Sequence, residues 1–155
     1  MKFSSRDDIE APIDFVFAQV SDFASLERSA LRRGAEVQRV DDLTSAGPGM
    51  QWQASFQFRG KTRHTTIELA EYDPPTWMAF NSHSNAIEGR LDVELVALSR
   101  TRTRLALKVL LTPRNLSARL LVQSMKLARS SLNKKFDARL RDYARDIEER
   151  YHRTA

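Results

Sequence analysis

Strict alternation of apolar and polar residues from Met50 to Phe58 constrains the fold of this chain more than any other feature. Every second position is apolar, and glutamine or serine fills each position between. A period of two is typical of a β-strand with one buried face and one wet face. Arg59 and Gly60 follow, and they predict a two-residue hairpin turn that pairs Phe58 with Lys61. In that register the odd-numbered positions of the next strand share the buried face.

Further strands are expected on both sides of this hairpin. Alternation over residues 87–95 and 105–111 predicts two more half-buried strands. Weaker patterns over residues 2–10 and 35–42 predict a first strand and an edge strand. With a strand at residues 77–83, five consecutive strands joined by short turns form an antiparallel meander.

Proline sets the register of the strand after the hairpin. The Asp73–Pro75 segment ends that strand, because proline has no N–H to donate to a sheet ladder. Pairing Tyr72 with Trp77 across this turn directs the even-numbered residues of the next strand toward the buried face.

Two short helices are expected after the first strand. Pro12 opens the first of them, since proline is favoured at a helix start, and apolar residues at helical spacing continue to Val20. Residues 21–33 predict the second, which Gly34 ends.

A single long helix is expected over residues 116–151, which contain neither glycine nor proline and carry an apolar stripe. At 1.5 Å per residue this helix would span about 54 Å, more than the roughly 30 Å width of a small domain. We therefore expect its end beyond Tyr143 to project, to bend near Ser130 and Ser131, or to pack on a second subunit through a stripe that includes Ile147. A homodimer is thus one alternative left open.

Composition excludes several kinds of site. The chain has no cysteine, so disulfides, thiolate metal sites and cysteine nucleophiles are absent. No segment reaches the roughly 18 apolar residues of a membrane span, and residues 1–5 lack a signal-peptide pattern. We therefore expect a cytoplasmic protein without stable membrane insertion. His64, His83 and His152 lack metal-site spacing, and we expect neither a metal nor a cofactor.

Positive charge is concentrated toward the C-terminus. The net charge is +5, and residues 113–155 contain eleven Lys or Arg against five Asp or Glu. Such a segment attracts nucleic acid or an anionic membrane surface, but interspersed acids are also typical of a solvated, salt-bridged helix. We adopt the second interpretation and expect no nucleic-acid partner.

The order of these elements resembles that of a known superfamily. A strand runs through Ala-Pro into a helix over Ile9–Phe23, the Asp73–Pro75 turn precedes Trp77, and Leu111–Leu132 joins the last strand to the long helix. In these features the chain resembles the START-like (SRPBCC) superfamily, which includes lipid-transfer domains and polyketide cyclase-like proteins. The resemblance implies a helix-grip α+β fold in which one domain, residues 1–155, curves an antiparallel sheet around the C-terminal helix. It also implies a cavity between sheet and helix for apolar molecules such as lipids or polyketides.

The register and the long helix together predict which side chains face that cavity. Aromatic, aliphatic and Met side chains suit an adaptable apolar site, although each is alternatively an ordinary core residue. The ligand-binding residues predicted on strands are Trp52, Phe56, Phe58, Arg63, Thr65, Ile67, Met78, Phe80, Ser82, Ile87 and Leu91. Those predicted on the helix are Leu121, Ser124, Met125, Ala128 and Leu132.

Arg63 is the polar position that bears most on function. The register turns it inward near the end of its strand, where it holds a ligand carboxylate or the enolate of a polyketide, or else extends to water. No inward His, Asp or Glu is expected, so no catalytic residue is assigned. The sequence predicts a binder, for transport or sensing, of a small hydrophobic ligand. The alternative is an enzyme like the polyketide cyclases and dehydratases.

Overall fold

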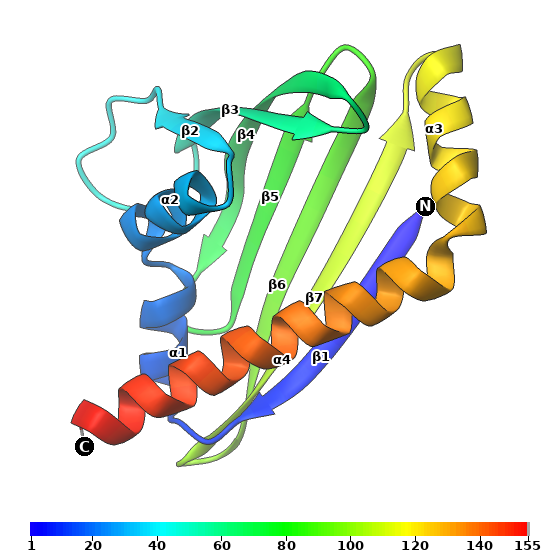
Figure 1. Ribbon diagram of the computed structural model, residues 1–155. Helices are drawn as coiled ribbons and strands as arrows, with labels where there is room; N and C mark the ends of the chain where they lie inside the picture. Colours follow the sequence, from blue (N-terminus) through cyan, green and yellow to red (C-terminus); the bar gives the residue numbers. More distant parts are fainter. Residues whose placement is uncertain (155) are drawn as a thin grey trace.

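A curved antiparallel sheet organises the molecule, with helices on its concave side (Figure 1). The computed structural model describes residues 1–154, and these form one sheet of seven strands in the order β1-β7-β6-β5-β4-β3-β2. The strands are β1 (Lys2–Ile9), β2 (Glu36–Arg39), β3 (Gln51–Phe58), β4 (Lys61–Asp73), β5 (Trp77–His83), β6 (Ile87–Ser99) and β7 (Arg102–Pro113). The helices are α1 (Ile13–Val20), α2 (Phe23–Arg32), α3 (Leu116–Leu127) and α4 (Arg129–Thr154). This architecture confirms the predicted helix-grip α+β fold.

The β3–β4 hairpin has the predicted register. Phe58 pairs with Lys61, as alternation and a two-residue turn require. The turn residues Arg59 and Gly60 have positive φ angles of 50° and 78°. Such angles at both central residues give a turn whose twist matches that of the flanking strands.

The β4–β5 pair keeps the predicted register only as far as a β-bulge. Leu69 pairs with Phe80, as expected, but the register then shifts and Tyr72 pairs with Met78 rather than with Trp77. A bulge places an extra residue in one strand, so the side chains beyond it change face. The tyrosine ring consequently packs against a phenylalanine ring of α1, with 5.7 Å between centroids. The expected pairing of Tyr72 with Trp77 is wrong for this reason.

Helices α1 and α2 begin close to where the sequence predicts. Pro12 immediately precedes α1, and its φ of −63° is the value that the proline ring imposes. Asp22 caps α2 by accepting a hydrogen bond from the backbone N–H of Ser25 at 3.2 Å. Gly34, with a φ of 89°, follows the end of α2.

The C-terminal segment forms two helices instead of one. The chain turns at Ala128, between α3 and α4, and Figure 1 shows the two helices at a wide angle to each other. The expected bend at Ser130 and Ser131 therefore occurs earlier in the chain. No glycine or proline marks the turn. Packing explains it, because α3 contacts β7 whereas α4 crosses β1 and reaches α1.

The C-terminal end of α4 packs on the body of the protein. Ile147 is fully buried, and Tyr151 packs edge-on against Phe15 of α1 with 5.1 Å between ring centroids. Arg150 donates a hydrogen bond to the side-chain oxygen of Gln19 at 2.9 Å. The expectation that this end projects is wrong, because α1 covers the apolar stripe that we assigned to a subunit contact.

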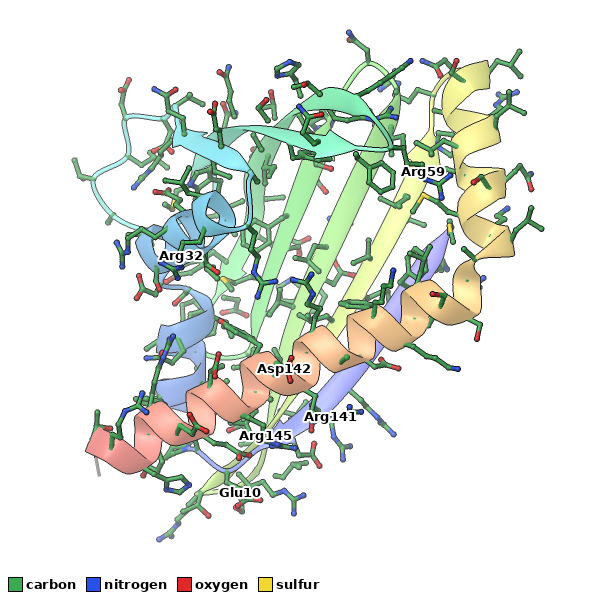
Figure 2. The ribbon with its side chains drawn as sticks, viewed as in Figure 1. Glu10, Arg32, Arg59, Arg141, Asp142 and Arg145 are labelled. Carbon is green, nitrogen blue, oxygen red and sulfur yellow. The ribbon has the colours of Figure 1, made fainter. Side chains whose placement is uncertain are left out.

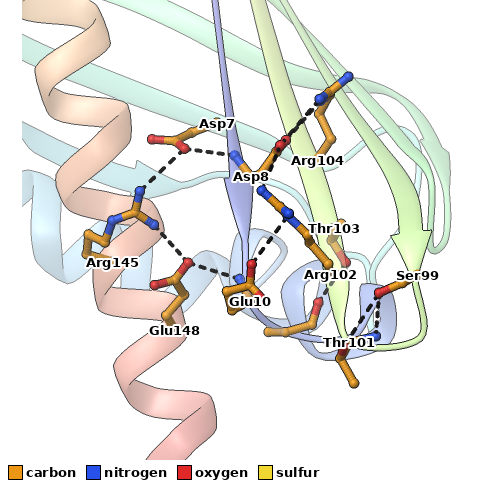
Figure 3. Close-up of polar contacts among 11 residues, drawn as sticks. Asp7, Asp8, Glu10, Ser99, Thr101, Arg102, Thr103, Arg104, Arg145 and Glu148 are labelled. Carbon is orange, nitrogen blue, oxygen red and sulfur yellow. Dashed lines mark hydrogen bonds and ion pairs between the residues drawn. The ribbon is translucent and has the colours of Figure 1, made fainter.

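A polar network fastens α4 to β1 and β7 (Figure 3). The Arg104 Nε donates to Asp8 at 2.9 Å, and this hydrogen bond lowers the pKa of the Asp8 carboxyl below its ordinary value. Arg145 of α4 lies 3.6 Å from Asp7 and 2.8 Å from Glu148. Charged groups from three separate elements thus hold α4 in place across the edge of the sheet.

Candidate ligand-binding cavity

A cavity of about 470 Å³ lies between the concave face of the sheet, α2 and α4. Strands β3 to β7 form its floor, and one residue of β2 borders it. Phe23, Leu26 and Glu27 of α2 form part of its wall, and α4 contributes Tyr143. A volume of this size is within the usual range for small-molecule sites.

Part of the predicted ligand-binding set lines this cavity. The predicted residues found there are Trp52, Ile67, Met78, Phe80, Ser82 and Leu91. Pairing brings them together from four strands, since Trp52 lies opposite Ile67 and Phe80 opposite Leu91. They are neighbours on one face because each obeys the alternation seen in the sequence.

The rest of the predicted set lies outside the lining of this cavity. These residues are Phe56, Phe58, Arg63, Thr65, Ile87, Leu121, Ser124, Met125, Ala128 and Leu132. The strand residues among them belong to the end of the sheet near the β3–β4 turn and the start of β6. Four of the helix residues lie on α3 or at the turn at Ala128, and α3 does not border the cavity, whereas Leu132 lies on α4, whose lining residue is Tyr143. Ligand contact by any of these residues stays a prediction.

Strand β7 supplies part of the floor that the predicted set omitted. Leu105, Leu107, Val109 and Leu111 face the cavity. Their alternation and the pairing of this strand with the preceding one were expected from the sequence, but no register was assigned to that pair, so these residues were not placed in the predicted site. In the structure Val109 lies opposite Leu91, which carries the cavity face of β6 onto β7.

Three aromatic rings form one side of the cavity. Trp52 lies 5.4 Å from Phe23 and 6.2 Å from Phe80, measured between ring centroids. Phe23 and Phe80 are themselves 6.2 Å apart in an edge-to-face arrangement. Tilted and edge-to-face contacts at these distances are the favoured geometries of aromatic pairs. The cluster joins α2 to the sheet and presents a rigid apolar surface.

Glu27 gives the cavity a carboxylate that sequence reasoning missed. The indole Nε1 of Trp52 donates a hydrogen bond of 2.6 Å to Glu27 Oε1. The signal was the helical spacing of Phe23, Leu26 and Glu27, which puts all three on one face of α2. The expectation of no inward acidic residue is therefore wrong, and an acceptor lies beside the aromatic cluster.

Ser82 brings a hydroxyl to the cavity where the neighbouring strand has no side chain. It pairs with Gly89 of β6. A Cβ atom built on Gly89 would lie 2.5 Å from Ser82 Oγ and 3.6 Å from Leu111. The glycine therefore keeps this part of the cavity floor open.

Tyr143 places a second hydroxyl at the cavity, from the side of α4. Its hydroxyl donates to the Gln19 carbonyl oxygen at 3.5 Å. Burial raises the pKa of Tyr143 to about 12, so the phenol stays protonated at neutral pH. Because its one proton is donated to Gln19, the hydroxyl oxygen can offer a ligand an acceptor, and the protonated phenol does not serve as a base.

Arginines near the cavity are occupied by partners within the protein. Arg90 borders the cavity, but its guanidinium binds Asp92 at 2.8 Å and Glu71 at 2.5 Å. Arg63 donates to the Phe58 carbonyl oxygen at 3.3 Å, and its guanidinium lies over the Phe58 ring. Neither guanidinium is directed to a ligand in the cavity.

Two predicted polar residues bond locally. The Thr65 hydroxyl donates to the His83 carbonyl oxygen at 3.0 Å. Ser124 of α3 accepts a hydrogen bond from Arg59 of the β3–β4 turn, and Figure 2 shows Arg59 beside α3. Among residues 1–154 no group of three or more His, Cys, Asp or Glu side chains is placed to hold a metal ion. Within the same residues no helix has the length and apolar character to cross a membrane.

Comparison with known families identifies the chain. Residues 1–148 match the model of the family described as polyketide cyclase / dehydrase and lipid transport. The chain belongs to this family. A search of curated proteins finds no significant match.

Solved structures share this fold across most of the chain. A protein from Thermus thermophilus has 16% sequence identity and a TM-score of 0.70, with 100% of this chain and 99% of that chain covered. The ZhuI aromatase/cyclase from a Streptomyces strain has 15% identity and a TM-score of 0.69, covering 97% of this chain and 94% of that one. A START superfamily protein from Mycobacterium smegmatis has 13% identity and a TM-score of 0.55, covering 86% and 95%. At such identities the likeness establishes the fold and leaves the ligand to be argued from the cavity.

Proposed function

We propose that this protein binds one small, uncharged hydrophobic molecule in the cavity, and that it transports or senses that molecule. The observation that carries the proposal is the make-up of the cavity wall. Aliphatic and aromatic side chains from five strands surround a few polar groups, which is the usual composition of a small-molecule site. Membership of a family that includes lipid transport supports the same class of ligand.

The polar groups favour a ligand that carries a hydroxyl. Glu27 accepts one hydrogen bond from Trp52 and has a second oxygen to accept another from the ligand. The Ser82 hydroxyl is placed to bond the same molecule from the cavity floor. A ligand carboxylate would lie near the Glu27 carboxylate without a cation to balance it, because Arg90 is bound by two acids. Dodecanol is therefore a better probe of this site than dodecanoate.

Intrinsic fluorescence offers a direct test, since the chain has two tryptophans and only Trp52 lines the cavity. Trp77 donates to Glu71 at 3.3 Å on the opposite face of the sheet and serves as the matched reporter. In a Trp77→Phe variant, dodecanol should produce a saturable change in emission. Dodecanoate should bind at least about tenfold more weakly, a cost typical of leaving a buried charge unpaired.

Two control variants separate binding in the cavity from the preference for an uncharged ligand. The Trp52→Phe variant should show little change on adding dodecanol, because its remaining tryptophan is remote from the cavity. Glu27→Gln should narrow the difference between the alcohol and the carboxylate. Absence of saturable binding by either probe would contradict the proposed function, whereas tighter binding of dodecanoate would contradict only the preference for an uncharged ligand.

A reaction on the bound molecule is the second candidate function. Glu27 favours it, because a carboxylate beside an apolar site is a plausible general base, and the fold is shared with an aromatase/cyclase. The two candidate functions predict different molecules after extraction from the protein. A carrier returns its ligand unchanged, whereas an enzyme of the cyclase type converts a linear poly-β-ketone into a cyclic product. Mass spectrometry of the extracted ligand distinguishes these outcomes, and Glu27→Gln should abolish conversion without abolishing binding.

A further inference from the structure

Helix α3 exposes three leucines to solvent. Leu127 is 92% exposed, Leu116 is 72% exposed and Leu120 is 64% exposed. At 3.6 residues per turn they lie within about 40° of one another around the helix axis. They therefore lie along one face of the helix, with Gln123 between Leu120 and Leu127, and we call these three leucines the leucine stripe.

The opposite face of α3 accounts for its attachment to the protein. Ala118 and Val122 are the buried residues of this helix, and they face β7. Ser124, which lies about 40° to 80° from the leucines around the helix axis, is bound by Arg59 of the β3–β4 turn. The leucines themselves lie on the side of the helix away from Ala118 and Val122, and the rest of the chain leaves them exposed. Exposed apolar residues gathered in this way are typical of an interaction surface.

Positive charge surrounds the leucine stripe. The chain contains no Asp or Glu between Glu94 and Asp137, a stretch that includes all of α3. Arg119 and Lys126 flank the stripe on one side, at roughly 60° to 120° from the leucines around the helix axis. Arg114, just before α3, differs from these two because it pairs with Glu88.

More cations gather at the turn between α3 and α4, where Leu127 lies. Arg129 donates a hydrogen bond to the Lys2 carbonyl oxygen at 2.9 Å, which brings β1 to this corner. The Met1 amine lies near the same corner and donates to the Leu111 carbonyl oxygen at 2.9 Å. The pKa of this amine is lowered by burial and by the charges of Lys126, Arg129 and Lys2. The most exposed leucine of the chain is thus set among positive charges.

This combination decides which partner fits. Apolar side chains with flanking cations match the boundary of an anionic bilayer, where acyl chains lie beneath phosphates. A symmetric contact between two copies would place the cations of one α3 against those of the other, which is unfavourable. A nucleic acid would use the cations and leave the leucines in water.

We propose that α3 is a peripheral membrane-docking helix, which inserts the leucine stripe among the acyl chains of an anionic lipid surface while Arg119, Lys126 and Arg129 contact phosphates. Docking of this kind is independent of what the cavity holds. It places the membrane close to the cavity, since Leu111 of the cavity floor precedes α3 by only a few residues. A helix in this position lies on the bilayer and does not cross it.

Flotation with lipid vesicles tests the proposal. Wild-type protein should float with vesicles of phosphatidylcholine and phosphatidylglycerol, and binding should weaken with rising salt. Vesicles of phosphatidylcholine alone should bind at least about tenfold less, since each basic residue near an anionic surface contributes about 1 kcal/mol.

Matched variants separate the leucine stripe from general surface hydrophobicity. Leu120→Gln should reduce binding about tenfold, because transfer of a leucine side chain into an apolar phase is favourable by about 1.5 kcal/mol or more. Leu31 of α2 is 63% exposed, nearly the same as the 64% of Leu120, so Leu31→Gln is the control and should bind as wild type. Lys126→Gln should also weaken binding, whereas Lys108→Gln on the convex face of the sheet should not.

Several results would overturn the proposal. Equal flotation with neutral and anionic vesicles would remove the role of charge, and equal loss in the Leu31 and Leu120 variants would remove the role of the stripe. A dimer that dissociates on Leu120→Gln, without vesicle binding by wild type, would assign the stripe to a second copy. Duplex DNA that binds wild type and the Leu120 variant equally, again without vesicle binding, would assign the charge to nucleic acid.

Discussion

Helices α3 and α4 follow each other in the chain and share one apolar spacing, but they differ in what covers them. Helix α4 buries Leu140, Ala144 and Ile147 against β1 and α1. Helix α3 buries only small or β-branched residues, Ala118 and Val122, and leaves the leucine stripe in solvent. The two helices also differ in charge: α4 makes ion pairs with β1, whereas the stretch containing α3 has no acidic residue.

The contrast shows that an apolar stripe has two uses in this protein. In α4 the stripe completes the core and holds the helix across the sheet. In α3 it remains free for a partner outside the chain. Periodicity alone does not separate these uses, because both stripes have helical spacing and differ only in their surroundings.

The largest predicted difference between the two helices is in the cost of truncating a stripe residue. Ile147→Ala should lower the free energy of unfolding by about 2–4 kcal/mol, because it leaves a cavity in the core. Leu127→Ala, at the most exposed leucine, should change it by less than about 0.5 kcal/mol. Urea unfolding of both variants measures the difference. Similar costs would mean that α3 is covered in solution.

A smaller difference is expected for the charged residues. Arg145→Gln removes the contacts of α4 with Asp7 and Glu148 and should cost up to about 1 kcal/mol, the range of partly exposed ion pairs. Arg119→Gln on α3 should have almost no effect on stability. The same unfolding experiment at low and high salt checks this prediction. The stability difference between wild type and Arg145→Gln should shrink at high salt, because salt screens the ion pairs that the variant lacks. The difference between wild type and Arg119→Gln should stay close to zero at both salt concentrations.

The smallest predicted effect is on pH dependence. Because the Arg104 hydrogen bond lowers the pKa of folded Asp8, this carboxylate stabilises the protein above the unfolded pKa of about 4. The stabilisation is lost as the pH falls through the folded value. Asp8→Asn should therefore be less stable than wild type at neutral pH and nearly equal to it in acid. A constant gap across acid pH would contradict the assigned role of Arg104.

Sequence reasoning succeeded for the strands because alternation is a local signal. The pairing of Phe58 with Lys61 follows from two strands and a turn within one short segment. The bulge after Leu69 was not predictable in the same way, since it carries neither glycine nor proline. It changed the face of Tyr72 without disturbing the cavity residues of β5.

Long-range packing decided which of the predicted residues line the cavity. One long helix was expected, with a bend near Ser130 as one alternative, but α3 packs on β7 whereas α4 crosses β1, so two helices meet at Ala128. Because α3 does not border the cavity, the predicted residues on α3 do not line it. Glu27 was missed because no pattern near it shows that α2 folds over the sheet beside Trp52. The cavity residues from β3 to β6 were therefore partly accessible from the sequence, whereas the β7 floor and the helical wall required the structure.

The measurement that tests the central claim most directly is a calorimetric titration of the folded protein with dodecanol. Gly89→Leu adds a side chain at the position where even a Cβ would approach Ser82, and it should weaken binding at least about tenfold by filling the cavity. Gly47→Leu adds the same side chain where the surroundings are open and should bind as wild type. Saturable binding lost only in the Gly89 variant is the predicted result. No saturable binding by wild type, or equal affinity in both variants, would contradict a ligand site in this cavity.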